Sequence, residues 1–167
     1  MPTPRQPNPP RSDAYSYLLL LLRHRPRSLA EAKERLTKQG YAPEVVEATL
    51  QRAIAADQLD DAAFAKLWVR DRIWHHPLSR NAVAQELRQK GVAADLIART
   101  LQQEYPAVKE IELATALADE RFNRLRAVPA NKRTARLLAY LQRRGFSRGL
   151  AIEAVRSVEE AIHRDDE

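Results

Sequence analysis

Apolar residues recur along this chain at helical spacing, and prolines and glycines interrupt the recurrence at regular places. In the central stretch Phe64, Leu67 and Trp68 lie three and four residues apart, a period that places them on one face of a helix. A proline and a serine separate this segment from a second one that ends at Gly91, where glycine is a typical helix stop. The pattern predicts a helix–turn–helix block over residues 57–92.

Similar blocks occur before and after this one. A Leu-x-x-x-Gly segment ends at Gly40, Gly91 and Gly145, so the glycines are 51 and 54 residues apart. Each glycine is followed at once by an apolar residue, and another apolar residue stands ten positions later. Recurrence at such a period is typical of tandem structural repeats.

Each unit is predicted to contain three helices, and the chain therefore nine. The expected first helices are 13–25, 60–75 and 108–127, the second 28–40, 79–91 and 131–145, and the third 43–56, 93–105 and 147–163. The units are then residues 13–56, 57–106 and 107–163, and residues 1–12, with five prolines, are expected to be a disordered tail. The predicted fold is all-α, an elongated array of helix-turn-helix-like units that each contact mainly their neighbours.

The composition of the chain excludes several classes of function. The chain of 167 residues has no cysteine, which excludes disulfides and thiolate chemistry. Its longest apolar run, residues 18–22, is far short of the roughly 20 residues of a membrane span, and no signal peptide is visible. We expect a cytoplasmic protein with no membrane contact.

No catalytic or metal-binding constellation is evident. The adjacent His75 and His76 would point about 100° apart on a helix and are poorly placed to chelate one ion. Asp60 and Asp61 are better explained as a helix start than as an acid pair. All glycines lie at helix ends or starts, so no phosphate-cradling loop is present. We expect no enzyme activity, no cofactor and no metal.

The two tryptophans allow different interpretations. Trp68 shares its helix with other apolar residues and is expected in the core. Trp74 stands at the end of that helix, where a core position and an exposed position for base stacking or partner binding both stay open.

One stretch of the sequence is strongly basic. The net charge is +6, and between residues 121 and 148 no acidic residue occurs. A solvated helix surface normally mixes charge signs, so an acid-free run indicates an anionic partner. The predicted partner- or DNA-binding residues are Arg121, Arg124, Arg126, Lys132, Arg133, Arg136, Arg143, Arg144 and Arg148.

These motifs resemble those of a known family. The central segments are Leu59-Asp-Asp-x-x-Phe64-Ala-x-x-Trp68-Val-x-x-Arg72, Pro77-x-Ser-Arg80 and Glu86-Leu-x-x-Lys90-Gly-Val92. They resemble the signature of RecX, a family of bacterial regulatory proteins that restrain the RecA recombinase. The segment from Arg25 to Ser28, with Glu31, Leu36 and Gly40 after it, is similar to the family's first-repeat motif. The third unit departs from the pattern, with Arg133-Thr134 where the others have serine.

The resemblance covers about residues 13–160 and implies a regulator of RecA. Such a protein lies in the groove of the RecA–DNA filament, blocks its extension and inhibits its recombinase, ATPase and coprotease activities. The expected partner is the RecA filament, DNA contact is weak or secondary, and we expect a monomer. Secondary candidate contacts are Arg25, Arg27, Arg72, Arg80, Arg88 and Lys90.

Two other classes remain open on the residues alone. Three-helix units with a glycine-containing turn are also typical of helix-turn-helix domains, so the chain could be a basic nucleic-acid-binding module with no dependence on RecA. A passive scaffold is the third class, but it would leave the acid-free basic stretch unexplained. Stronger binding to RecA–DNA filaments than to bare DNA would distinguish the first class from the second.

Overall fold

The computed structural model describes residues 13–165, which form nine α-helices and contain no strand. The helices are α1 (Ala14–His24), α2 (Leu29–Lys38), α3 (Pro43–Ala55), α4 (Asp61–Trp74), α5 (Arg80–Gln89), α6 (Ala94–Glu104), α7 (Ala107–Arg124), α8 (Ala130–Arg143) and α9 (Arg148–Asp165). The predicted all-α class is confirmed. The proline-rich segment 1–12 lies outside the described residues, so its disorder stays a prediction.

Side-chain caps fix the starts of several helices. Asp13, Ser28, Asp60 and Ser79 precede α1, α2, α4 and α5, and each accepts hydrogen bonds from first-turn N–H groups. These groups have no partner inside the helix, which is why short polar side chains are favoured there. Pro43 begins α3, where its missing N–H costs nothing.

A left-handed glycine ends the second helix of each unit, as predicted. The φ angles are 93° at Gly40, 76° at Gly91 and 86° at Gly145. The next residue donates its N–H back to the carbonyl of the repeated leucine, at N···O distances of 3.4, 3.1 and 3.2 Å in chain order. These bonds close the helix ends and direct the chain into the third helix.

Each unit has its own apolar core. The repeated leucines Leu36, Leu87 and Leu141 are each fully buried, one in each of three separate clusters. Leu59, from the connection between α3 and α4, completes the first cluster. Leu113 of α7 packs against both the second and the third cluster. Apolar contacts thus cross both boundaries between units, through Leu59 at the first and Leu113 at the second.

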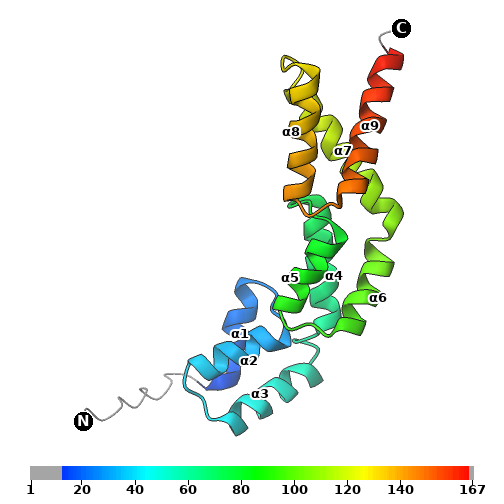
Figure 1. The fold of residues 1–167 in the computed structure, drawn as a ribbon. Coiled ribbons are helices and arrows are strands. Elements are labelled where there is room, and N and C mark those ends of the chain that lie inside the picture. Colours follow the sequence, from blue (N-terminus) through cyan, green and yellow to red (C-terminus); the bar gives the residue numbers. More distant parts are fainter. Residues whose placement is uncertain (1–12, 166–167) are drawn as a thin grey trace, which may run out of the picture.

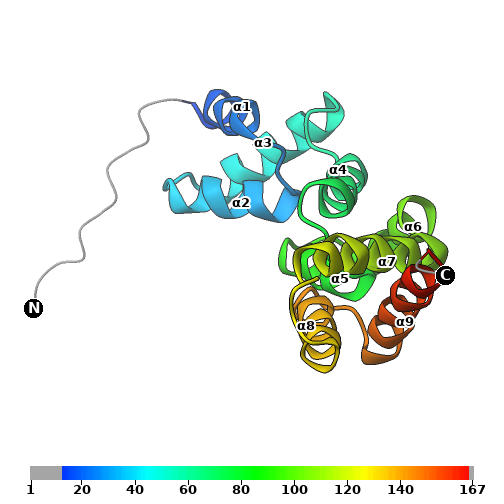
Figure 2. The same ribbon diagram turned by 90° about the horizontal axis from the view of Figure 1, so that it is seen from above.

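The units follow one another along an elongated, bent molecule (Figure 1). Unit 1 (α1–α3) lies at one end, unit 2 (α4–α6) in the middle and unit 3 (α7–α9) at the other end. Seen from above, unit 1 is offset to one side of units 2 and 3 (Figure 2). The predicted tandem arrangement of three three-helix units is confirmed.

Some details differ from the expectation. Leu67 was predicted on the buried face of its helix but is 51% exposed, because α4 packs through Phe64, Ala65 and Val69. Trp68 lies only half-buried at the edge of the second core. Trp74 is 76% exposed, which decides between its two interpretations in favour of the surface.

Candidate partner-binding surface and unit junctions

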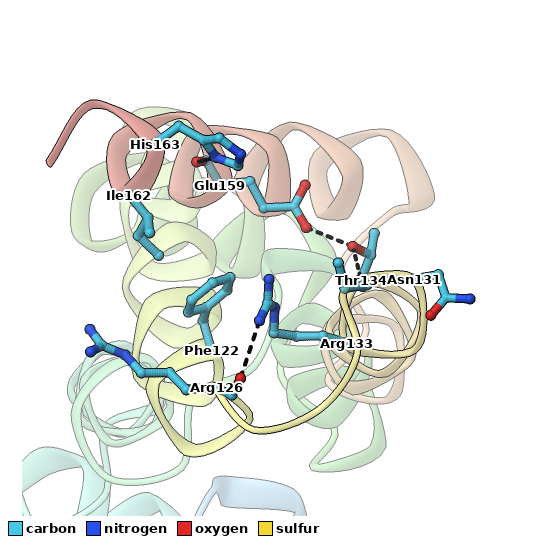
Figure 3. Close-up of a pocket in the computed structure, with 9 residues that line it drawn as sticks. Phe122, Arg126, Asn131, Arg133, Thr134, Glu159, Ile162 and His163 are labelled. Carbon is cyan, nitrogen blue, oxygen red and sulfur yellow. Dashed lines mark hydrogen bonds between the residues drawn. The ribbon is translucent and has the colours of Figure 1, made fainter. Parts of the chain in front are cut away.

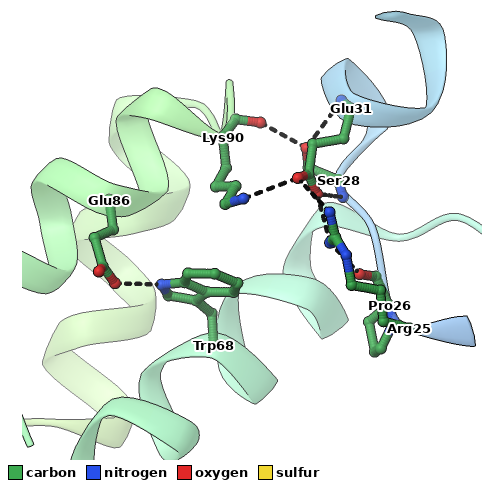
Figure 4. A network of polar contacts seen from close by, with 7 residues as sticks. All are labelled: Arg25, Pro26, Ser28, Glu31, Trp68, Glu86 and Lys90. Carbon is green, nitrogen blue, oxygen red and sulfur yellow. Dashed lines mark hydrogen bonds and ion pairs between the residues drawn. The ribbon is translucent and has the colours of Figure 1, made fainter. Parts of the chain in front are cut away.

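The first junction joins the start of α2 to the end of α5 (Figure 4). The Ser28 Oγ donates to the Lys90 carbonyl oxygen at 2.5 Å, and the Leu29 backbone N–H donates to the Asp61 Oδ1 at 2.8 Å. From the sequence, Asp61 was assigned to the start of its own helix. Asp61 is indeed the first residue of α4, and its carboxylate also caps the helix of the preceding unit. Burial raises the pKa of the Asp61 carboxyl, and the hydrogen bond from Leu29 opposes the rise.

An ion cluster reinforces this junction. The Glu31 carboxylate lies between Arg25 and Lys90, at N···O distances of 2.9 and 2.8 Å. Burial opposes ionisation of Glu31, but hydrogen bonds from Arg25, Lys90 and a backbone N–H outweigh it and lower the pKa of Glu31 to about 2. The Lys90 ammonium also lies 4.9 Å from the centre of the Trp68 ring, and the Trp68 Nε1–H donates to Glu86 at 2.8 Å. This arrangement positions Trp68 beside the junction.

The second junction repeats the first one unit later. The Ser79 backbone N–H donates to the Arg144 carbonyl oxygen at 3.0 Å, and the Arg144 guanidinium donates to the Pro77 carbonyl oxygen at 2.8 Å. The Arg80 backbone N–H donates to the Glu110 Oε1 at 2.9 Å. In both junctions a carboxylate from the next unit caps the first N–H of the second helix, and the glycine turn packs on the serine-bearing end.

The turn glycines of units 2 and 3 lie very close to the preceding unit. A Cβ on Gly91 would lie 2.4 Å from the Ala30 Cβ, and one on Gly145 would lie 2.7 Å from the Ser79 Oγ and 2.8 Å from the Ala82 Cβ. Side-chain atoms do not approach so closely. These glycines are therefore required for the junction as well as for the helix end.

The nine predicted cations do not form one continuous face. Arg124 forms an ion pair with Glu120, which lies one residue before the acid-free stretch. Arg144 is engaged in the second junction. At least two of the nine cations therefore have partners within the chain, and partner binding by the set stays a prediction. Six of the nine are exposed, namely Arg124, Arg126, Lys132, Arg136, Arg143 and Arg148. Three are half-buried, namely Arg121, Arg133 and Arg144.

Three of the exposed cations form a stripe on α8. Lys132, Arg136 and Arg143 follow one another at intervals of four and seven residues, which places them on one side of the helix. Tyr140 is half-buried on the same side, with arginine guanidinium groups from α7 and from the end of α8 at 5.4 and 5.1 Å from its ring centre. Lys132, Arg136 and Arg143, the α8 stripe, are thus exposed cations within the predicted surface, and their contact with an anionic partner stays a prediction.

The secondary candidates are mostly engaged inside the molecule. Arg72 contacts Asp71 and Glu86, and its guanidinium lies 4.3 Å from the Trp68 ring centre. Arg27 is 9% exposed, and burial, with other arginines nearby, lowers its pKa. Arg25 and Lys90 each form an ion pair with Glu31. Arg80 is half-buried, and Arg88 is exposed.

The described residues lack two kinds of feature. Within residues 13–165 no three or more histidine, aspartate and glutamate side chains gather where they could hold a metal ion. In the same part of the chain no helix combines the length and the apolar character needed to cross a bilayer.

Comparison with known proteins agrees with this architecture. Family models for the first, second and third three-helix domains of RecX match residues 14–52, 60–101 and 109–155. The chain belongs to the RecX family. The regulatory protein RecX of Thermobifida fusca is 38% identical over 148 residues, which are 89% of this chain and 80% of that protein. RecX of Mycolicibacterium smegmatis is 36% identical over 171 residues, with 99% and 90% covered.

Solved RecX structures share the fold. A crystal structure of RecX from Lactobacillus salivarius superposes with a TM-score of 0.75 at 18% identity, covering 87% of this chain and 94% of that one. A second crystal structure of a regulatory protein RecX gives a TM-score of 0.70 at 30% identity, with 86% and 70% covered. The resemblance stated from the sequence motifs is confirmed, and the relatives are named as regulatory proteins.

Proposed function

We propose that this chain restrains a RecA-type recombinase by binding along the RecA–DNA filament and blocking its extension. Membership of the RecX family over all three domains carries the proposal. The elongated array supports it, because linked units can each make a weak contact along a helical groove, and such contacts add through effective concentration. The chain acts as a monomer in the cytoplasm, without catalytic activity of its own.

The α8 stripe supplies the electrostatic part of this proposal. Lys132, Arg136 and Arg143 are exposed on one side of a helix in the unit that ends the array. Cations so placed attract the phosphates of filament-bound DNA or acidic protein surfaces, and they raise the rate of encounter. The stripe contacts the filament, with DNA as the secondary partner.

RecA ATP turnover on single-stranded DNA tests the proposal. Equimolar chain is expected to reduce DNA-dependent ATP hydrolysis and to shorten filaments, because a blocked end cannot add protomers. The chain incubated alone with ATP and DNA serves as the control and should show no turnover. Unchanged ATP turnover and unchanged filament length with the chain present would refute the proposal.

A basic nucleic-acid-binding module with no RecA dependence is the second candidate. The observation that favours it is the same α8 stripe beside Tyr140, since cations next to an aromatic ring also suit single-stranded nucleic acid. In that case the chain would bind bare DNA as tightly as it binds the filament.

A further inference from the structure

Unit 3 has a cavity at one end. The same end of units 1 and 2 contacts the next unit. The cavity, of about 590 Å³, lies between the end of α7, the start of α8 and the end of α9 (Figure 3). The corresponding starts of α2 and α5 form the two junctions. In the part of the chain that the structure describes, no further unit covers the end of unit 3.

The cavity combines cationic and apolar walls. The Arg133 guanidinium lies 4.2 Å from the centre of the Phe122 ring, and Ile162 lines the same space. The Arg133 Nη1 donates to the Arg126 carbonyl oxygen at 3.5 Å, whereas its Nε is buried and has no hydrogen-bond partner among residues 13–165. Arg126 adds a second cation to the lining. The carboxylate that lines the cavity, from Glu159, already accepts a hydrogen bond from Thr134 at 2.6 Å. The lining therefore carries an excess of positive charge.

The two junctions show what this end of a unit binds. In unit 1 the first N–H of α2 donates a hydrogen bond to a carboxylate oxygen of Asp61. In unit 2 the first N–H of α5 donates one to a carboxylate oxygen of Glu110. The equivalent N–H in unit 3 belongs to Ala130, which lines the cavity and has no hydrogen-bond partner among the residues described. A carboxylate at this N–H would also face the guanidinium of Arg133.

A second copy of the chain does not fit as the occupant. Pro129 stands before α8, where the other units have the serine that contacts the glycine turn. The helix has 14 residues instead of 10, and Arg133 lies inside it. At the other end of the array Ala14 begins α1, where unit 2 has the capping carboxylate of Asp61. Within residues 13–165, neither end of the array keeps the groups that join its own units.

We propose that the cavity at the end of unit 3 binds an acidic segment of a protein partner, with an aspartate or glutamate carboxylate at Ala130 N–H and Arg133. An apolar residue next to that carboxylate packs on Phe122 and Ile162. A peptide fits better than a nucleic-acid phosphate, because both equivalent sites in this chain hold a side-chain carboxylate and because a phosphate backbone leaves the apolar wall unused. The proposal names the chemistry of the bound segment and does not depend on the identity of the partner.

Titration of the full-length, ¹⁵N-labelled chain with two short peptides tests this proposal. The probe is the capped peptide Ser-Glu-Leu-Glu-Leu-Gly, and its control replaces both glutamates by glutamine. The glutamate peptide is expected to shift the amide signals of Ala130, Asn131 and Thr134. It should bind at least about tenfold more tightly than the control, since a hydrogen bond to an ionised group is about twice as strong as one between neutral groups. Equal binding of the two peptides would overturn the proposal.

Two charge-removing variants sharpen the test. Arg133→Gln removes the cavity cation and should weaken binding of the glutamate peptide by about tenfold or more. Lys66→Gln removes the same charge from the exposed surface of unit 2, far from the cavity in sequence, and should leave the affinity within about twofold, as expected of an exposed charge. Equal losses in the two variants would contradict the assignment. An oligo-dT that competes with the peptide and shifts the same amides would identify a phosphate site and overturn the proposal.

Discussion

At the scale of single residues, each turn glycine has a conformational role, and two also have a packing role. Gly91 adopts φ 76° and leaves no room for a Cβ beside Ala30. Gly149, near the start of α9, has open space around its Cβ position and no positive φ. The left-handed turns could be predicted from Leu-x-x-x-Gly, but the contact with Ala30 could not, because no local pattern tells which residue of another unit faces the turn.

Gly91→Ala should therefore destabilise the protein, whereas Gly149→Ala should not. At Gly91 the left-handed backbone costs a non-glycine residue about 1 kcal/mol or more, and the clash with Ala30 adds to that cost. At Gly149 alanine should be neutral or stabilising by up to about 1 kcal/mol. Urea unfolding followed by circular dichroism measures both. Equal losses at the two positions would show that the glycine turn does not hold the junction.

Acid should weaken the first junction through Glu31. Its pKa falls from 4.5 to about 2 on folding, so its contribution to stability is fully present above pH 4.5 and is lost as the pH falls toward 2. Asp61 acts in the opposite direction, since burial raises its pKa. Glu31→Gln should lower the free energy of unfolding at pH 7 and flatten its dependence between pH 5 and 3. An unchanged pH profile in this variant would exclude Glu31 as the acid-sensitive group.

At the scale of helices, most of the architecture could be predicted and the junctions could not. Helical periodicity, caps and the repeated Leu-x-x-x-Gly segment located all nine helices because these signals act within a few residues. The basic stretch could be recognised by its composition. Its division into an exposed α8 stripe, the second-junction residue Arg144 and the cavity residue Arg133 depends on contacts between distant segments. Such contacts produce no periodic pattern of residues in a single sequence.

The α8 stripe is therefore a cleaner target for mutation than the whole basic stretch. Changing Lys132, Arg136 and Arg143 together to glutamine should leave the fold intact, because all three are exposed. It should weaken inhibition of RecA by at least about tenfold, equivalent to about 1.4 kcal/mol. The salt dependence of binding should also become shallower, since fewer charges are screened.

A matched variant controls for net charge. Changing the exposed Lys33, Lys66 and Arg99 to glutamine removes three positive charges from units 1 and 2. We expect this variant to inhibit nearly as well as the unmodified chain. If the control loses as much activity as the stripe variant, or if the stripe variant inhibits at the original concentration, the α8 stripe is not the contact surface.

At the scale of the whole molecule, separate cores joined by narrow junctions produce a long array rather than one compact body. Each of the three apolar clusters is built almost entirely from one unit, and hydrogen bonds and an ion pair cross the first junction. An array of this kind can place several weak contacts along an extended partner, and the total affinity then exceeds that of any one unit. The bent shape in Figures 1 and 2 suits a groove better than a flat surface.

The central claim is that the chain recognises the RecA–DNA filament and not DNA alone. Fluorescence anisotropy of the chain, labelled at its N-terminal amine, measures binding to preformed filaments and to the same single-stranded DNA without RecA, at one salt concentration. We predict at least about tenfold tighter binding to the filament, a difference of about 1.4 kcal/mol or more. Equal affinity for filament and bare DNA would contradict the account and identify the chain as a nucleic-acid-binding module.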